Sequence, residues 1–173
     1  EVYLAETCRL FVLIALLAAA IGKTANFRRF RDSLDEAFPT LRRDGAMLIA
    51  AAILIGEWSA ALLMLAGGAW SRAGLLLASG LFVFLTAVVA VVLAKGLSVR
   101  CNCFGASQRR ISGYDLLRNL LFIAAAGVGL CGASVSGIAG VFGGLALPVY
   151  LPMVAVALML FQLSTGLREI VHI

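Results

Sequence analysis

The sequence predicts an all-α integral membrane protein, a bundle of four to five transmembrane helices that forms a single domain over residues 1–173. Two observations support this fold class. Of the residues, 62% are hydrophobic and 13% are charged, whereas a soluble globular chain is about half apolar and about a quarter charged. The apolar residues also gather into runs of roughly 20, the length at which a helix crosses a bilayer. This composition excludes a secreted disulfide scaffold, a disordered tail and an ordinary cytosolic enzyme.

The first helix is expected over residues 3–21, with Cys8 and Arg9 near its start and Lys23 just past its end. Its apolar run resembles the core of a signal peptide. Glu6, however, stands close to Arg9, where a basic lead-in would be expected. We therefore interpret this segment as a retained membrane helix.

A polar stretch follows over residues 26–39. Its apolar side chains recur at spacings of three and four residues, at Phe27, Phe30, Leu34 and Phe38. This spacing is typical of a short amphipathic helix lying in the plane of the lipid headgroups. A connecting loop anchored by the same side chains would show the same pattern, so both interpretations stay open.

Three further membrane helices are expected after this stretch, and a small-residue segment precedes the last one. Glycine at positions 67 and 68 ends the second helix, and a short turn containing Arg72 leads into the third. Pro152 should bend the first turn of the last helix. The glycines between positions 137 and 144 form a loop or a close packing surface. Trp58 is predicted as a core residue and Trp70 as an interfacial anchor. The expected helices cover residues 46–66, 73–94, 114–132 and 148–167.

The formal net charge of +5 is concentrated in two of the connections. Because basic residues accumulate in cytoplasmic loops, five spans would place the N-terminus outside and the loop that contains Cys101 on the cytoplasmic face. Basic residues between apolar runs are typical of topology signals and headgroup contacts, so we expect no nucleic-acid partner. The basic residues of the two connections are Lys23, Arg28, Arg29, Arg31, Arg42 and Arg43 in the first, and Lys95, Arg100, Arg109 and Arg110 in the third.

The most specific motif is Cys101-Asn102-Cys103-Phe104-Gly105, in a polar segment with basic neighbours such as Arg100. Cations stabilise the thiolate, which is the nucleophile in disulfide exchange. A disulfide closed across one residue is a small strained ring, which favours transfer to another dithiol. Two alternatives remain: inert loop thiols, or a Cu(I) or zinc site, although the only histidine, His172, lies far along the chain.

Two further cysteines, Cys8 and Cys131, are expected to approach the face opposite this motif. They could meet and form a second dithiol, which would allow electrons to cross the bilayer. Alternatively, they are small apolar residues that fill space in the bundle.

Glu57 lies near the middle of the second predicted membrane helix. Ionisable groups at such depth are costly, and they usually face the bundle interior and pair with another group. Lys23 and Arg118 are the candidate partners, and Asn119 is expected to add a hydrogen bond. The pair would act as a proton acceptor or would only fix helix packing.

Taken together, Lys23, Glu57, the cysteine pentapeptide and the Arg118-Asn119 pair resemble the MauE family of the wider DoxX-like membrane proteins. The resemblance implies a small helical membrane protein that assists disulfide formation or thiol redox in exported proteins, often alongside a thioredoxin-like protein. It also implies that Cys101 and Cys103 are the redox pair and that the other four residues form a polar cluster beneath them.

The sequence therefore predicts a thiol-disulfide oxidoreductase of the bacterial inner membrane. We expect a thioredoxin-like or other cysteine-containing partner, contact with lipid, no metal, and a quinone or a second dithiol as electron acceptor. An assembly subunit or chaperone without catalysis is the alternative, and a Cu(I)-handling protein is less favoured. A cytoplasmic cysteine loop would conflict with exported substrates and favour a reductant relay. The predicted catalytic residues are Cys101, Cys103, Glu57 and Arg118, and the predicted partner-binding residues are Arg100, Phe104, Lys23 and Asn119.

Overall fold

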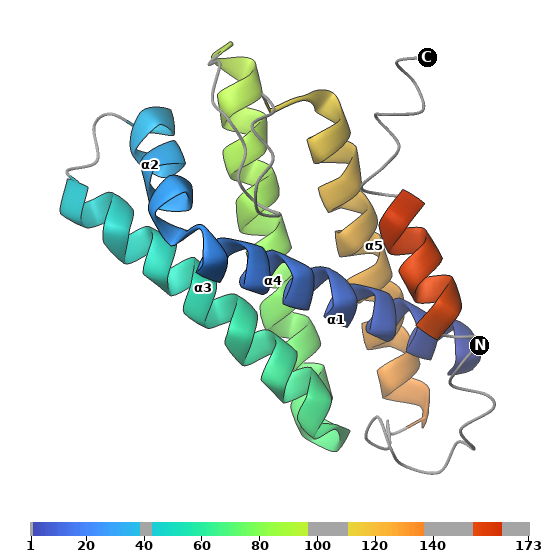
Figure 1. Cartoon of the computed structure of the whole chain (residues 1–173). Coiled ribbons are helices and arrows are strands. Elements are labelled where there is room, and N and C mark those ends of the chain that lie inside the picture. Colours follow the sequence, from blue (N-terminus) through green and yellow to red (C-terminus); the bar gives the residue numbers. More distant parts are fainter. Residues whose placement is uncertain (1, 39–42, 97–110, 137–153, 164–173) are drawn as a thin grey trace.

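The chain folds into a bundle of helices (Figure 1). The computed structural model describes residues 2–38, 43–96, 111–136 and 154–163, and in this part of the chain every regular element is a helix. The elements are α1 (Val2–Ala25), α2 (Phe27–Ala37), α3 (Arg43–Ala66), α4 (Gly68–Ala94), α5 (Gly113–Ser136) and a short helix, Val154–Leu163.

Four of these helices are long and apolar enough to cross a membrane, which confirms the predicted all-α membrane bundle. The short helix Val154–Leu163 lies within the fifth predicted span. Pro152 and the glycine-rich stretch over residues 137–144 lie outside the described residues. The candidate spans are Tyr3–Ala25, Asp44–Ala66, Gly68–Ala94 and Gly113–Gly132.

The polar stretch after α1 is a helix over Phe27–Ala37, so a helix rather than a connecting loop is confirmed there, and its place in the headgroup plane stays a prediction. Its apolar side packs against α3, where Phe30 forms a cluster with Ala50 and Ile53. Leu34 packs on the edge of the same cluster. The apolar side of α2 therefore contacts protein, and its charged residues lie on the remaining surface.

The connection between α3 and α4 is shorter than predicted. α3 ends at Ala66 and α4 begins at Gly68, so Arg72 lies inside α4 and not in the turn that was expected to hold it. Gly67 and Gly68 have φ values of 75° and 58°. Glycine adopts this left-handed backbone without a steric penalty, which allows the chain to reverse within a single residue.

α1 is the central helix of the bundle. Of its membrane-length window, 61% is buried, against 33% or less in the other three spanning helices. It contacts α3, α4 and α5, and in Figure 1 it crosses in front of α4. Phe11 of α1 lies 5.3 Å from Phe122 of α5, which in turn lies 5.2 Å from Phe82 of α4, measured between ring centroids. These aromatic contacts join three helices at one level of the core.

Glycine allows α3 and α4 to approach closely. A Cβ atom placed on Gly74 of α4 would lie 2.8 Å from both the carbonyl oxygen of Ala60 and the backbone nitrogen of Met64. A close approach through small residues is typical of helix packing in membranes. At the other side of the bundle, Gly132 of α5 faces Ala5 of α1 in the same way.

Candidate functional site

A buried ion pair joins α1 to α3. Lys23, two residues before the end of α1, places its Nζ atom 2.5 Å from Oε1 of Glu57 in α3. Each side chain is 1% exposed. Removing two charges from water is expensive, and only a close opposite charge compensates for it. Of the two predicted partners of Glu57, Lys23 is therefore the one that forms the salt bridge.

Other side chains enclose this pair. The Phe30 ring of α2 lies with its centroid 5.3 Å from Lys23 Nζ. Trp58 is half-buried, whereas a core position was predicted, and its Nε1 donates to Thr24 Oγ1 at 3.3 Å. The second carboxylate oxygen of Glu57, Oε2, is buried and has no hydrogen-bond partner among the described residues. Among the described residues, the Lys23 ammonium group is thus the partner of one of the two carboxylate oxygens of Glu57.

The remaining polar residues of the predicted cluster lie on α5. Arg118 forms a salt bridge with Asp115 at 3.3 Å, within the same helix. Asp115 also accepts a hydrogen bond from the Ser112 backbone N–H at 2.9 Å, which caps the start of α5. Asn119 is buried at 7% exposure. Arg118 and Asn119 therefore lie within the first two turns of the helix that follows the cysteine segment.

The predicted redox motif, Cys101 and Cys103 with Arg100 and Phe104, lies outside the described residues. The residues on either side of that segment are described. Val92 of α4 and Ile111 before α5 form a cluster with Ala37 and Phe38 at the end of α2. The described residues before and after the cysteine segment therefore meet beside the C-terminal end of α2.

Comparison with known proteins identifies the family. A family model described as methylamine utilisation protein MauE matches residues 1–132. The chain belongs to the MauE family. No curated protein and no solved structure matches it. The match covers α1 to α4, the cysteine segment and most of α5, so all the predicted site residues lie within the MauE region. Together with its four apolar helices, it makes the chain a multi-pass membrane protein in contact with lipid.

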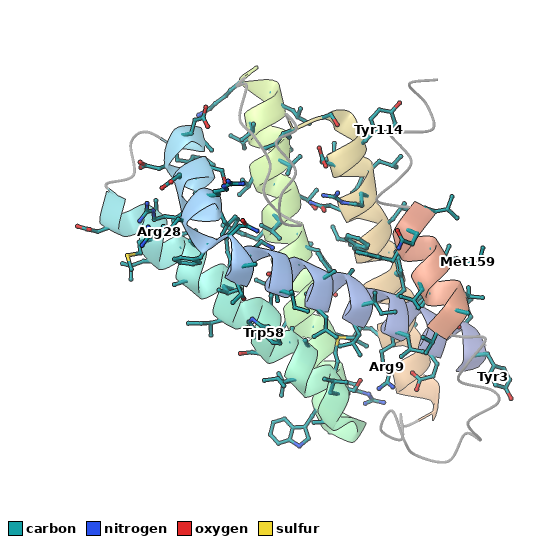
Figure 2. All side chains as sticks on the ribbon, viewed as in Figure 1. Tyr3, Arg9, Arg28, Trp58, Tyr114 and Met159 are labelled. Atoms are coloured by element: carbon teal, nitrogen blue, oxygen red, sulfur yellow. The ribbon has the colours of Figure 1, made fainter. Side chains whose placement is uncertain are left out.

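This MauE chain contains a second buried ionic group that was not predicted. Arg9 Nε lies 2.6 Å from Glu6 Oε2, one turn earlier in α1. Arg9 Nη1 donates a hydrogen bond to Ser71 Oγ of α4 at 3.1 Å. Figure 2 shows Arg9 in the N-terminal part of α1, away from Trp58. Two opposite charges three residues apart in an apolar helix were the pattern that could have revealed it.

The two remaining cysteines of this MauE protein lie on α1 and α5. Cys8 is half-buried, Cys131 is exposed, and both are free thiols. Ala5 and Gly132 bring their helices together at this end of the bundle. In the part of the chain that is described, no three His, Cys, Asp or Glu side chains form a cluster that could hold a metal ion.

The arrangement places a carboxylate and an ammonium group in direct contact inside the bundle. A carboxylate has two oxygens that accept hydrogen bonds, and the contact with Lys23 occupies one of them. The surrounding core excludes bulk water, which strengthens each electrostatic interaction within it.

Proposed function

We propose that this MauE-family chain is a thiol-disulfide oxidoreductase of the bacterial inner membrane. Cys101 and Cys103 are its redox pair, and Glu57 accepts the proton that accompanies electron transfer. The observation that carries the proposal is the buried Lys23–Glu57 pair, because an ionisable group at membrane depth is costly and usually marks a functional site.

The exchange step transfers the disulfide from Cys101 and Cys103 to the partner. A thiolate of the partner attacks one sulfur of the Cys101–Cys103 disulfide, and a mixed disulfide forms while the other cysteine leaves as a thiolate. The second partner thiolate then attacks the mixed disulfide. The partner is oxidised to a disulfide, and Cys101 and Cys103 are left as a dithiol. Arg100 favours the thiolate that leaves, and Phe104 offers an apolar contact to the partner.

Restoring the disulfide removes two electrons and two protons from the dithiol. A lipid-soluble quinone is the chemical class of acceptor that takes both, and we assign no described residue to it. Glu57 Oε2 supplies a proton site within the bundle. Arg118 and Asn119, early in α5, would support the chain between the cysteine segment and this site.

The partner that fits this chemistry is a thioredoxin-like or other cysteine-containing protein. Its two thiols would be oxidised together to one disulfide. The partner would approach the end of the bundle where α2, α4 and the start of α5 meet.

The test uses the full chain in lipid vesicles with a reduced thioredoxin-like protein and a quinone. In the Cys101→Ser/Cys103→Ser variant, oxidation of the partner should fall to the rate of protein-free vesicles. The matched control, Cys8→Ser/Cys131→Ser, removes the same number of thiols and should keep the wild-type rate. Acid quenching followed by alkylation and mass spectrometry measures both thiol pools. If oxidation of the partner continues unchanged without Cys101 and Cys103, the redox proposal is wrong. The interpretation that then remains is an assembly subunit without redox activity.

A further inference from the structure

We propose that Phe30 of α2 is a positioning residue that holds the Lys23 ammonium group on Glu57. The amphipathic helix would thus control the charge of the buried carboxylate. The inference deepens the proposed function, because it concerns the group given the proton-accepting role. It rests on contacts among α1, α2 and α3 and on the packing of α2 against Val92 and Ile111, and it can be tested without the cysteines.

The geometry of Lys23 carries the first step. Its ammonium group has three N–H donors, and Glu57 Oε1 takes one of them. The Nζ atom also lies 5.3 Å from the centroid of the Phe30 ring, within the range at which a ring face attracts a cation. Because Lys23 is 1% exposed, the ring stands where water would otherwise solvate the charge.

The packing of Phe30 carries the second step. The ring is 3% exposed and packs with Ala50 and Ile53 of α3, which lie two turns and one turn before Glu57. α3 therefore provides both the carboxylate and the support for the ring. Lys23 is held between them, and only Asn26 separates its helix from α2.

The position of α2 carries the third step. Two turns beyond Phe30 on α2, Ala37 packs with Val92 and Ile111, which flank the cysteine segment. One rigid helix thus contacts the ion pair near its start and the base of that segment at its end. A partner that displaces α2 would withdraw the ring from Lys23 and weaken the hold on Glu57.

A carbodiimide that dissolves in lipid tests this role, because dicyclohexylcarbodiimide reacts with protonated carboxyl groups and leaves carboxylates intact. The Lys23 ammonium group favours the ionised form of Glu57, so labelling of the wild type should be slower than labelling of a variant in which this contact is loosened. Phe30→Leu removes the ring and keeps an apolar side chain, so labelling of Glu57 should rise about two- to tenfold. Phe30→Trp keeps an aromatic face and should label like the wild type.

Phe27→Leu is the matched control, because Phe27 packs on the same cluster, whereas the ring placed over Lys23 Nζ is that of Phe30. It should leave labelling unchanged. Peptide mapping separates Glu57 from the other buried glutamate, Glu6. If Phe30→Leu does not fold, pentafluorophenylalanine introduced at position 30 keeps the shape of the ring and reverses its charge distribution, and it should raise labelling equally.

Phe30→Leu and the pentafluorophenylalanine variant both lack an attractive ring face. If both label Glu57 at the wild-type rate, the inference is overturned. It is also overturned if Phe27→Leu raises labelling of Glu57 as much as Phe30→Leu does. The Cys101→Ser/Cys103→Ser variant should show wild-type labelling, so a failure of the redox proposal leaves this result intact. Conversely, unchanged labelling in Phe30→Leu together with full cysteine-dependent oxidation would reject only the role of Phe30.

Discussion

Arg9 and Lys23 are among the largest fully buried side chains of the molecule. Both lie on α1, and both are matched by a carboxylate within 2.6 Å. A buried pair adds little net stability compared with apolar residues of similar size, but removing one partner leaves a charge without compensation. At the residue scale, each ion pair should therefore be sensitive to single substitutions and tolerant of paired ones.

Lys23→Met provides the test of this asymmetry. The substitution keeps the length of the side chain and leaves Glu57 without its ammonium partner. We expect a loss of about 3–5 kcal/mol in the free energy of unfolding, since this is typical when one member of a buried pair is removed. Unfolding of the purified protein in mixed micelles of increasing denaturing detergent measures it.

The control for this substitution is Lys95→Met, at an exposed position just after α4, where the change should be within about 0.5 kcal/mol. The double variant Lys23→Met/Glu57→Met should recover most of the loss. A double variant that is as unstable as Lys23→Met alone would contradict a charge imbalance as the cause.

The residue scale also shows what the sequence could predict about the site. A carboxylate in the middle of an apolar helix requires a cation, so Lys23 and Arg118 were the candidates for Glu57. Choosing between them required the packing of the helices. The contact from Arg9 to Ser71 was not predictable, because Ser71 was assigned to a turn and becomes a helical residue only when α4 begins at Gly68.

At the scale of elements, the apolar runs predict the four spanning helices because a helix is the simplest way to satisfy the backbone inside lipid. Their ends were harder to place. The start of α4 depends on the backbone of Gly67, which composition does not encode. The choice of helix over loop for α2 depends on its cluster with α3, a contact between segments about 20 residues apart.

The contact between α3 and α4 leads to a prediction for Gly74→Ala. The added methyl group would meet backbone atoms of Ala60 and Met64, which cannot move aside separately. We expect a loss of about 1–3 kcal/mol in the free energy of unfolding. The same unfolding in mixed micelles that is used for Lys23→Met measures it. Gly80→Ala in the same helix is the matched control, because its methyl group would meet nothing within 4 Å.

The control should be neutral or slightly stabilising, since alanine favours a helix by about 1 kcal/mol over glycine. Equal effects of the two substitutions would show that helix propensity alone governs this pair of positions.

At the scale of the whole molecule, basic residues collect at one end of the bundle. Arg28, Arg29 and Arg31 lie on α2, and Lys95 follows α4. Arg72 lies near the opposite end, one turn into α4. Tyr114 and Tyr3, which start α5 and α1, mark the two ends in Figure 2. Since basic residues are retained on the cytoplasmic side, the end that carries α2 should face the cytoplasm.

Single cysteines at the two ends of α4 test this orientation. In a background without the four native cysteines, Lys95→Cys should react with a membrane-impermeant maleimide only in inverted vesicles. Trp70→Cys, at an exposed position about 38 Å away along the helix, should react only in intact cells. The reverse pattern would place the base of the cysteine segment outside, where exported partners are found.

The arrangement of the helices does not by itself lead to the redox proposal. Thiol chemistry is suggested by Cys101 and Cys103 in a basic segment, and it depends on residue type and spacing. The bundle determines only where the segment begins and ends, beside Val92 and Ile111. The membrane bundle follows from long apolar runs, whereas membership of the MauE family rests on the family match over residues 1–132.

The two charges of α1 also constrain how the protein is made. α1 leaves the ribosome before α3 and α4, yet Lys23 obtains its counter-charge from α3, and Arg9 donates a hydrogen bond to Ser71 of α4. A chain that ends before α3 lacks the Glu57 carboxylate, so Lys23 would lie in the membrane without this counter-charge. Compensation of the two charges of α1 is therefore completed by helices that are synthesised later.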